Sequence, residues 1–330
     1  MFTFKIYLDQ NIWDRIVKNR FSELCINSSE DAKIEYCYSD TTLEEFSRIE
    51  NDNDRLPYLN ALQEKKAKYL NVDNETEIST LQDINPINKY NDYIENRKSY
   101  SHIMTNTEDF LFKIISGNEE RSFDEIFHSM FSQVRDILKD SMKNVSPLDT
   151  EYNHNLSQLY LQAEKQISGL EQMLTESFKN NKLISPTNNA IKNHGFIDRK
   201  EFNNIPSENA VQYAWAKTKV FLLNNNIDEF DKIEDFFHSV LSNQPNTKWN
   251  WMTKINSLYN YLNYVGYWQD EKLHKKRNYI PSVNDTNHAY YAAFAHLFLT
   301  RDSRFFKKLK AVYSYFNIET KVYHYTEKKK

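Results

Sequence analysis

Two short apolar segments, one near each end of the chain, lead into an aspartate. Phe4–Leu8 leads directly to Asp9, and His296–Thr300 leads through Arg301 to Asp302. Short runs of this kind are typical of buried β-strands, and a helical pattern follows each of them. Because parallel strands of one sheet end at a common edge, we expect both aspartates to face the same crevice. The two ends of the chain would then form one α/β domain.

Most of the remaining chain carries helical patterns. The spacing of apolar residues predicts helices over Asn11–Phe21, from Thr41 onward, over Asn284–Ala295 and over Phe305–Phe316. Runs of β-branched or aromatic residues predict strands over Ile34–Tyr38 and Thr320–Tyr323. With only 4 Gly and 7 Pro for turns, the chain favours long helices, above all between residues 71 and 247. We therefore predict a parallel sheet flanked by helices, formed by residues 1–70 and 248–330, with an all-helical insertion at 71–247.

The charge is distributed unevenly along the chain. Residues 271–330 hold 13 Lys and Arg against 5 Asp and Glu, a net charge of +8, so the other 270 residues carry −12 of the total of −4. A basic block in an acidic protein suits local contact with phosphates. No run approaches the roughly 18 apolar residues of a membrane span. The N-terminus lacks the pattern of a signal peptide, and Cys25 and Cys37 are predicted to be buried thiols, so we expect a cytoplasmic protein without membrane partners.

Four carboxylates are predicted to converge at one edge of the sheet. Asp9 and Asp302 follow strands, Glu45 lies in the first turn of the helix after the second strand, and Asp285 begins the helix that leads to the last aspartate. Clustered carboxylates repel one another, so a cation must compensate them. Oxygen ligands at this density suit Mg²⁺ or Mn²⁺. The alternative for each single aspartate is an ordinary helix cap or turn residue.

Three segments resemble the motifs of PIN-like nucleases. YLDQNIW (7–13) resembles their first motif, and SDTTLEEF (39–46) resembles the second, in an alignment that selects Glu45 and not Glu44. NDTNHAYYAAFAHLFLTRDSRF (284–305) resembles the third and fourth motifs. The chain looks closest to a bacterial PIN-like group whose third motif reads Asp-x-x-His, and it departs from that group at His296, where an acid is common. The resemblance covers about 70 residues at the start and 60 at the end.

The resemblance implies a metal-dependent endoribonuclease with Asp9, Glu45, Asp285 and Asp302 as catalytic metal ligands. It implies Mg²⁺ or Mn²⁺ as cofactor, a single-stranded or structured RNA such as tRNA as substrate, and products with a 5′-phosphate. A large insertion suits a regulated effector of a toxin or phage-defence system, in which the insertion selects the substrate or holds a regulatory protein. A homo-oligomer is left open.

Supporting roles follow from the same placement. Asn11 is expected to orient Asp9, Thr300 to hold a ligand or water through its hydroxyl, and His288 to contact substrate or orient Asp285 one turn away. The alternatives are a helix-start cap for Asn11 and a satisfied buried histidine for His288. Four basic residues are expected to hold a nucleic-acid backbone, or else to form a solvated helix face: Arg301, Arg304, Lys307 and Lys308.

Other functions remain open at this point. Arg121 and His128 have the Arg-x6-His spacing of HEPN ribonucleases, a spacing that is common by chance. Trp249, Trp251 and the aromatic run 257–268 could stack on unpaired bases, although such a stripe is more often core. The alternatives to an RNA nuclease are an inactive PIN-like scaffold and a DNA-directed nuclease.

Overall fold

Six strands among the described residues form one sheet in the order β4-β3-β2-β1-β5-β6. The computed structural model describes residues 2–21, 32–73, 75–116, 121–143, 150–180, 197–224, 230–241, 248–271 and 275–326. The strands are β1 (Phe2–Leu8), β2 (Ala32–Tyr38), β3 (Lys68–Val72), β4 (Ser79–Gln82), β5 (Leu297–Thr300) and β6 (Lys321–His324). All neighbours are parallel except β3 and β4. The predicted α/β class with a largely parallel sheet is therefore confirmed.

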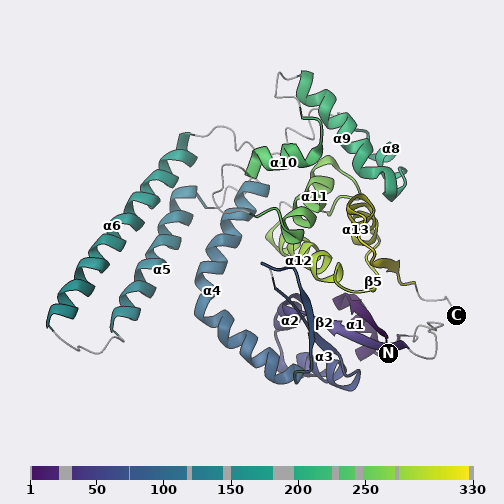
Figure 1. Ribbon diagram of the computed structural model, residues 1–330, viewed down its shortest axis with the longest axis horizontal. Coiled ribbons are helices and arrows are strands. Elements are labelled where there is room, and N and C mark those ends of the chain that lie inside the picture. The colour runs from purple at the N-terminus through teal and green to yellow at the C-terminus, as the bar shows by residue number, and fades with distance from the viewer. Residues whose placement is uncertain are drawn as a thin grey trace. The chain divides into compact units, whose positions relative to one another are not determined.

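The centre of the sheet joins the two ends of the chain. β1 pairs with β2 on one side and with β5 on the other, with Ile6 opposite Leu297 and Leu8 opposite Leu299. In Figure 1 the purple N-terminal and the yellow C-terminal segments consequently lie side by side. Because the chain leaves β1 toward β2 and later returns to its other side, the carboxyl ends of β1 and β5 form a topological switch point, where such sheets bind ligands.

Helices cover both faces of the sheet. Successive side chains of each strand point to opposite faces, so neighbouring residues of β1 pack against different helices. Ile6 and Leu8 share one buried cluster with α1 (Gln10–Val17), α2 (Asp40–Ser47) and α3 (Asp52–Glu64). Tyr7 belongs to the other cluster, with α9 (Ser207–Asn224), α11 (Trp251–Val265), α12 (Lys276–Ala292) and α13 (Ser303–Phe316). Cys37 is buried there as predicted, whereas Cys25 lies outside the described residues.

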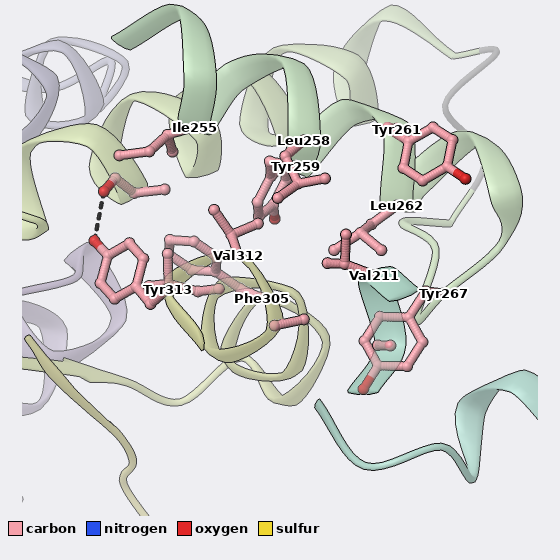
Figure 2. Close-up of a cluster of buried hydrophobic side chains, with 14 of the residues drawn as sticks. Val211, Ile255, Leu258, Tyr259, Tyr261, Leu262, Tyr267, Phe305, Val312 and Tyr313 are labelled. Carbon is pink, nitrogen blue, oxygen red and sulfur yellow. Dashed lines mark hydrogen bonds between the residues drawn. The ribbon is translucent and has the colours of Figure 1, made fainter. Parts of the chain in front are cut away.

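The larger cluster is rich in aromatic side chains (Figure 2). α11 presents Tyr259 and Leu262 to Phe305 and Val312 of α13, and all four side chains are buried. The Tyr313 hydroxyl donates to the Ala289 carbonyl at 2.5 Å, which ties α13 to α12. The aromatic run that could have stacked on bases is thus largely core.

Contacts divide the described chain into two compact units. The unit with the sheet comprises Met1–Glu95, His194–Lys272 and Arg277–Lys330. The other comprises Asn96–Asn193 and Leu273–Lys276, and contains most of α4 (Pro86–Ser116), with α5 (Phe123–Lys143) packed on α6 (Thr150–Asn180).

These units differ from the predicted all-helical insertion at 71–247. β4 lies within that segment and pairs with β3, which the sequence patterns did not indicate because both strands are short. The sheet-containing unit also includes α8 (Arg199–Asn203), α9 and α10 (Ile233–Leu241). α9 belongs to it because Ala210, Val211 and Ala214 are buried in the cluster that includes α13. The unit without a strand among its described residues is therefore the shorter one, Asn96–Asn193 with Leu273–Lys276.

Candidate metal centre

Asp9 lies where β1 gives way to α1, at the switch point of the sheet. Its backbone N–H donates to the Leu299 carbonyl at 3.1 Å, so the end of β1 is fixed to β5. Asp9 is the N-cap residue of α1, but its side chain does not cap the helix. The carboxylate is therefore available for another task, although only 5% of the residue is exposed.

Asn11 and Thr300 hold the Asp9 carboxylate from two sides. The Thr300 hydroxyl donates to Asp9 Oδ2 at 2.6 Å, and the Asn11 side-chain amide donates to the same oxygen. The side-chain oxygen Oδ1 of Asn11 in turn accepts the Arg301 backbone N–H at 2.9 Å. Asn11 thus bridges the ends of β1 and β5, and the orienting role predicted for it matches these contacts.

Glu45 and His288 reach the same place from two helices. Glu45 lies on α2, which begins at Ser39 with a capping box, and His288 lies on α12. His288 Nε2 is 2.8 Å from Glu45 Oε2. Glu45 is 9% exposed and His288 is fully buried. Sequence reasoning placed His288 beside the site only as a supporting residue.

Asp9, Glu45 and His288 form a group that could hold a metal ion. Each offers one ligand atom, and these atoms lie within 4.8 Å of one another. In octahedral coordination with ligand distances of about 2.1 Å, neighbouring ligand atoms lie about 3.0 Å apart and opposite ones about 4.2 Å apart. The observed spacing therefore needs only small side-chain adjustments, and the donor set of two carboxylates and an imidazole fits a divalent cation.

The electrostatics of the group favour a compensating cation. Burial, reinforced by the Glu45 carboxylate, raises the pKa of Asp9 to about 6, against the opposing effects of His288 and the Thr300 hydroxyl. Burial opposes protonation of His288, but the carboxylates of Glu45 and Asp9 outweigh it and raise its pKa. The ionised carboxylate of Asp9 is thus costly without a cation.

Asp285 and Asp302 lie near this group but outside it. The Asp285 carboxylate accepts the Tyr259 hydroxyl at 3.4 Å. Its pKa is raised well above the ordinary value, by burial first and then by the carboxylates of Asp270 and Asp9. Asp302 instead caps α13, accepting the N–H groups of Arg304 at 2.7 Å and Phe305 at 2.9 Å.

The placement of these two acids differs from the sequence analysis in two respects. α12 begins at Lys276, so Asp285 lies within that helix and does not open it. Asp302 is an ordinary helix cap, which was the alternative to a metal ligand for each aspartate. Its backbone N–H donates to the Thr300 hydroxyl at 3.0 Å, and this hydroxyl also contacts Asp9. The four predicted carboxylates thus share one neighbourhood, but the close group has His288 in place of Asp285 and Asp302.

The expected contact of Lys308 with a nucleic-acid backbone is wrong. Its side chain is fully buried, donates to Asn263 Oδ1 at 2.8 Å and pairs with Asp270. Position 308 follows Phe305 by three residues, so it lies on the buried face of α13. Arg301 and Lys307 are half-buried, and Arg304 pairs with Glu271 at 2.5 Å. Their role toward nucleic acid stays a prediction.

The weaker sequence signals have structural partners. Arg121 pairs with Asp109 at 2.6 Å, and His128 lies 3.1 Å from Glu171, both within the helical unit. Each residue of the Arg-x6-His pair thus has an acidic partner within the helical unit. His296, at the position where the similar group has an acid, accepts the Lys5 backbone N–H at 3.0 Å.

Sequence reasoning missed Tyr7 as part of the centre. Its hydroxyl lies 2.8 Å from His288 Nδ1 and 2.6 Å from Ser39 Oγ, and burial raises the pKa of Tyr7 well above its ordinary value. A signal existed, since a tyrosine in a buried strand must find a partner for its hydroxyl.

Comparison with protein-family models gives no match, and neither the curated proteins nor the solved structures compared contain a significant relative. None of the described helices combines the length and apolar character needed to cross a bilayer. The assignment of function therefore depends on the site.

Proposed function

We propose that this chain is a metal-dependent endoribonuclease of the PIN-like type, with a divalent cation held by Asp9, Glu45 and His288. The observation that carries the proposal is the convergence of these three buried side chains, from β1, α2 and α12, at the carboxyl edge of a parallel sheet. That edge, at the switch point between β1 and β5, is where this class of sheet binds ligands.

The donor set favours Mn²⁺ over Mg²⁺. Mg²⁺ prefers oxygen ligands and retains several waters, whereas an imidazole shifts preference toward transition metals, and Mn²⁺ accepts both donor types. When bound, the cation would activate a water and stabilise the negative charge that develops in a phosphodiester displacement.

The surrounding residues would prepare the centre for this cation. Asn11 and Thr300 hold one oxygen of Asp9 and so direct its other oxygen. The carboxylates of Asp9 and Asp302 help to raise the pKa of Asp285, so a cation at the group would also offset the charge of these outer acids. Arg301 and Arg304 follow the end of β5 and would supply affinity for the substrate backbone.

RNA, single-stranded or structured as in tRNA, is the substrate class that the motif resemblance supports. The helical unit formed by α5 and α6 would select the substrate or bind a regulatory protein, as expected of a toxin or phage-defence effector. A DNA substrate is the alternative outcome of the same assay.

Glu44 and Glu45 provide a matched pair for the test. Both lie on α2, but Glu44 pairs with Arg48 at 3.2 Å and does not belong to the candidate metal group. Purified wild type, Glu45→Gln, Asp9→Asn and Glu44→Gln are incubated with RNA and DNA of the same sequence, with Mn²⁺, Mg²⁺ or chelator. We expect wild type and Glu44→Gln to cut RNA with Mn²⁺ and leave 5′-phosphates, and the other two to be inactive. Undiminished cutting by Glu45→Gln, or cutting in chelator, would refute the proposal.

A second candidate function has one specific observation in its favour. The three ligands are at most 9% exposed, which also suits a structural metal in a PIN-like scaffold without turnover. In that case chelation would unfold the protein cooperatively and none of the substrates would be cut. A nuclease would instead keep its fold in chelator and lose only cleavage.

A further inference from the structure

A chain of hydrogen bonds runs through the interior behind the candidate ligands. It leads from Ser39 Oγ to the Tyr7 hydroxyl (2.6 Å), then to His288 Nδ1 (2.8 Å), and from His288 Nε2 to Glu45 Oε2 (2.8 Å). Ser39, Tyr7 and His288 are each fully buried. The chain connects β1, the start of α2 and the middle of α12.

The geometry fixes the imidazole of His288 on two sides. The Tyr7 ring packs edge-on against it, with ring centroids 5.6 Å apart at 60°. The Tyr7 hydroxyl meets Nδ1, so Nε2 points toward Asp9 and Glu45. Since a buried polar group without a partner is costly, the ring has little freedom to turn while Tyr7 is in place.

The same chain controls which ring nitrogen carries the proton. A neutral imidazole has one N–H, and the nitrogen that binds a cation must be the other one. With a cation on Nε2, Nδ1–H donates to the Tyr7 oxygen, and the Tyr7 hydroxyl donates to Ser39. Without a cation, Nε2–H can donate to Glu45 while Tyr7 donates to Nδ1 and Ser39 donates to Tyr7. The ring carries one proton in both arrangements: when a cation binds, Nε2 gives its proton to water, Nδ1 takes one up from water, and the Tyr7 and Ser39 hydroxyls rotate to match.

We propose that Tyr7, supported by Ser39, is the positioning residue of the metal centre. It holds His288 with Nε2 toward Asp9 and Glu45, and its oxygen accepts the hydrogen bond of Nδ1–H when Nε2 binds a cation. This rests on the proposed function only in assigning a cation to the group. The hydrogen-bond partner of a metal-binding histidine typically changes metal affinity by about 10–100-fold.

The test compares Tyr7→Phe with Tyr261→Phe in the full chain. Tyr261 is a matched control, because its buried hydroxyl bonds Thr218 at 2.6 Å and so joins α11 to α9. Ser39→Gly is a second variant that removes the supporting hydroxyl, and glycine is tolerated as an N-cap residue. Mn²⁺ affinity is measured by electron paramagnetic resonance. The His288 tautomer is measured by ¹⁵N NMR of histidine-labelled protein with and without Zn²⁺, a diamagnetic probe, with the resonance assigned from His288→Gln.

We expect Tyr7→Phe to bind Mn²⁺ about 10–100-fold more weakly than wild type, Ser39→Gly to show a smaller loss, and Tyr261→Phe to match wild type. In wild type with Zn²⁺ the His288 proton should be on Nδ1. Wild-type affinity in Tyr7→Phe, or in Ser39→Gly if Tyr7→Phe does not fold, would overturn the proposal.

A wild type that binds no cation would refute the proposed function, and the metal-free spectra would then decide the role of Tyr7. Tyr7→Phe removes the hydrogen-bond partner of His288 Nδ1, so the Nδ1 resonance of the metal-free protein should shift from its wild-type position. An unchanged Nδ1 resonance would reject the positioning role.

Discussion

Neutralising Asp9 should stabilise the protein when no cation is present. Burial and Glu45 raise the pKa of Asp9 from 3.8 to about 6. The folded state therefore holds a proton that the unfolded chain releases as the pH rises from about 4 to 6. Above pH 6 the Asp9 carboxylate is ionised in the folded state as well. The difference of about 2 pKa units then lowers the free energy of unfolding by about 3 kcal/mol. Asp9→Asn removes this cost and keeps an oxygen that can accept from Asn11 and Thr300.

The assay is thermal unfolding in chelator at several pH values. At pH 8 we expect Asp9→Asn to melt above wild type by roughly 6–12 °C, at about 2–4 °C per kcal/mol for a domain of this size. The difference should vanish below about pH 3, where both the folded and the unfolded states of wild type are protonated at Asp9. Adding Mn²⁺ at 1,000 times its Kd should reverse the order, because it stabilises wild type by about 4.1 kcal/mol, which exceeds the cost of about 3 kcal/mol.

Asp14 provides a control of opposite sign. Lys18 and Tyr58 bond the Asp14 carboxylate and lower its pKa despite partial burial, so Asp14→Asn should be less stable than wild type at pH 8. The reasoning is refuted if Asp9→Asn melts below wild type in chelator at pH 8, or if the difference between them does not depend on pH.

Three further predictions concern the neighbouring residues. Thr300→Val should lower the free energy of unfolding by about 1–3 kcal/mol, because Asp9 loses a buried donor, and Thr300→Ser should restore most of it in urea titrations. Lys308→Met should lower the free energy of unfolding by about 1–3 kcal/mol, because Asp270, whose side chain is 16% exposed, keeps the hydrogen bonds of Asn263 and Ser282 but loses its ion partner. Lys307→Met should stay within about 0.5 kcal/mol, and equal effects in urea would contradict the ion-pair interpretation. Arg301→Glu should flatten the salt dependence of RNA binding by about 0.7 log–log units per lost contact, and an unchanged slope would place the RNA path elsewhere.

The central strands could be predicted because their signal is local. β1 and β5 are short apolar runs that end at polar residues, and the parallel arrangement then placed Asp9 and Thr300 at one edge. β3 and β4 could not be predicted, since neither carries a long alternating pattern and β3 follows a helix closely. β3 pairs with the free edge of β2, and β4 pairs with β3 in an antiparallel hairpin. Both strands therefore depend on tertiary contacts that a local sequence pattern does not reveal.

The side chains of the site were harder to predict than the strands. Asp302 and Asp9 have the same local sequence context, a strand before and a helix after, yet only Asp302 caps its helix. His288 was placed beside the acids, but its direct approach to Glu45 depends on the packing of α12 across the sheet from α2. Lys308 was assigned to solvent because it is charged, although its spacing from Phe305 put it on the buried face.

The position of a bound cation tests the central claim most directly. Crystals grown with Mn²⁺ would be measured at the manganese absorption edge, and the anomalous difference map would locate the ion without reference to activity. Our account predicts a peak bounded by Asp9, Glu45 and His288 Nε2, with ligand distances of about 2.1 Å. Crystals with no peak at that position, at a Mn²⁺ concentration that supports cleavage, would contradict it.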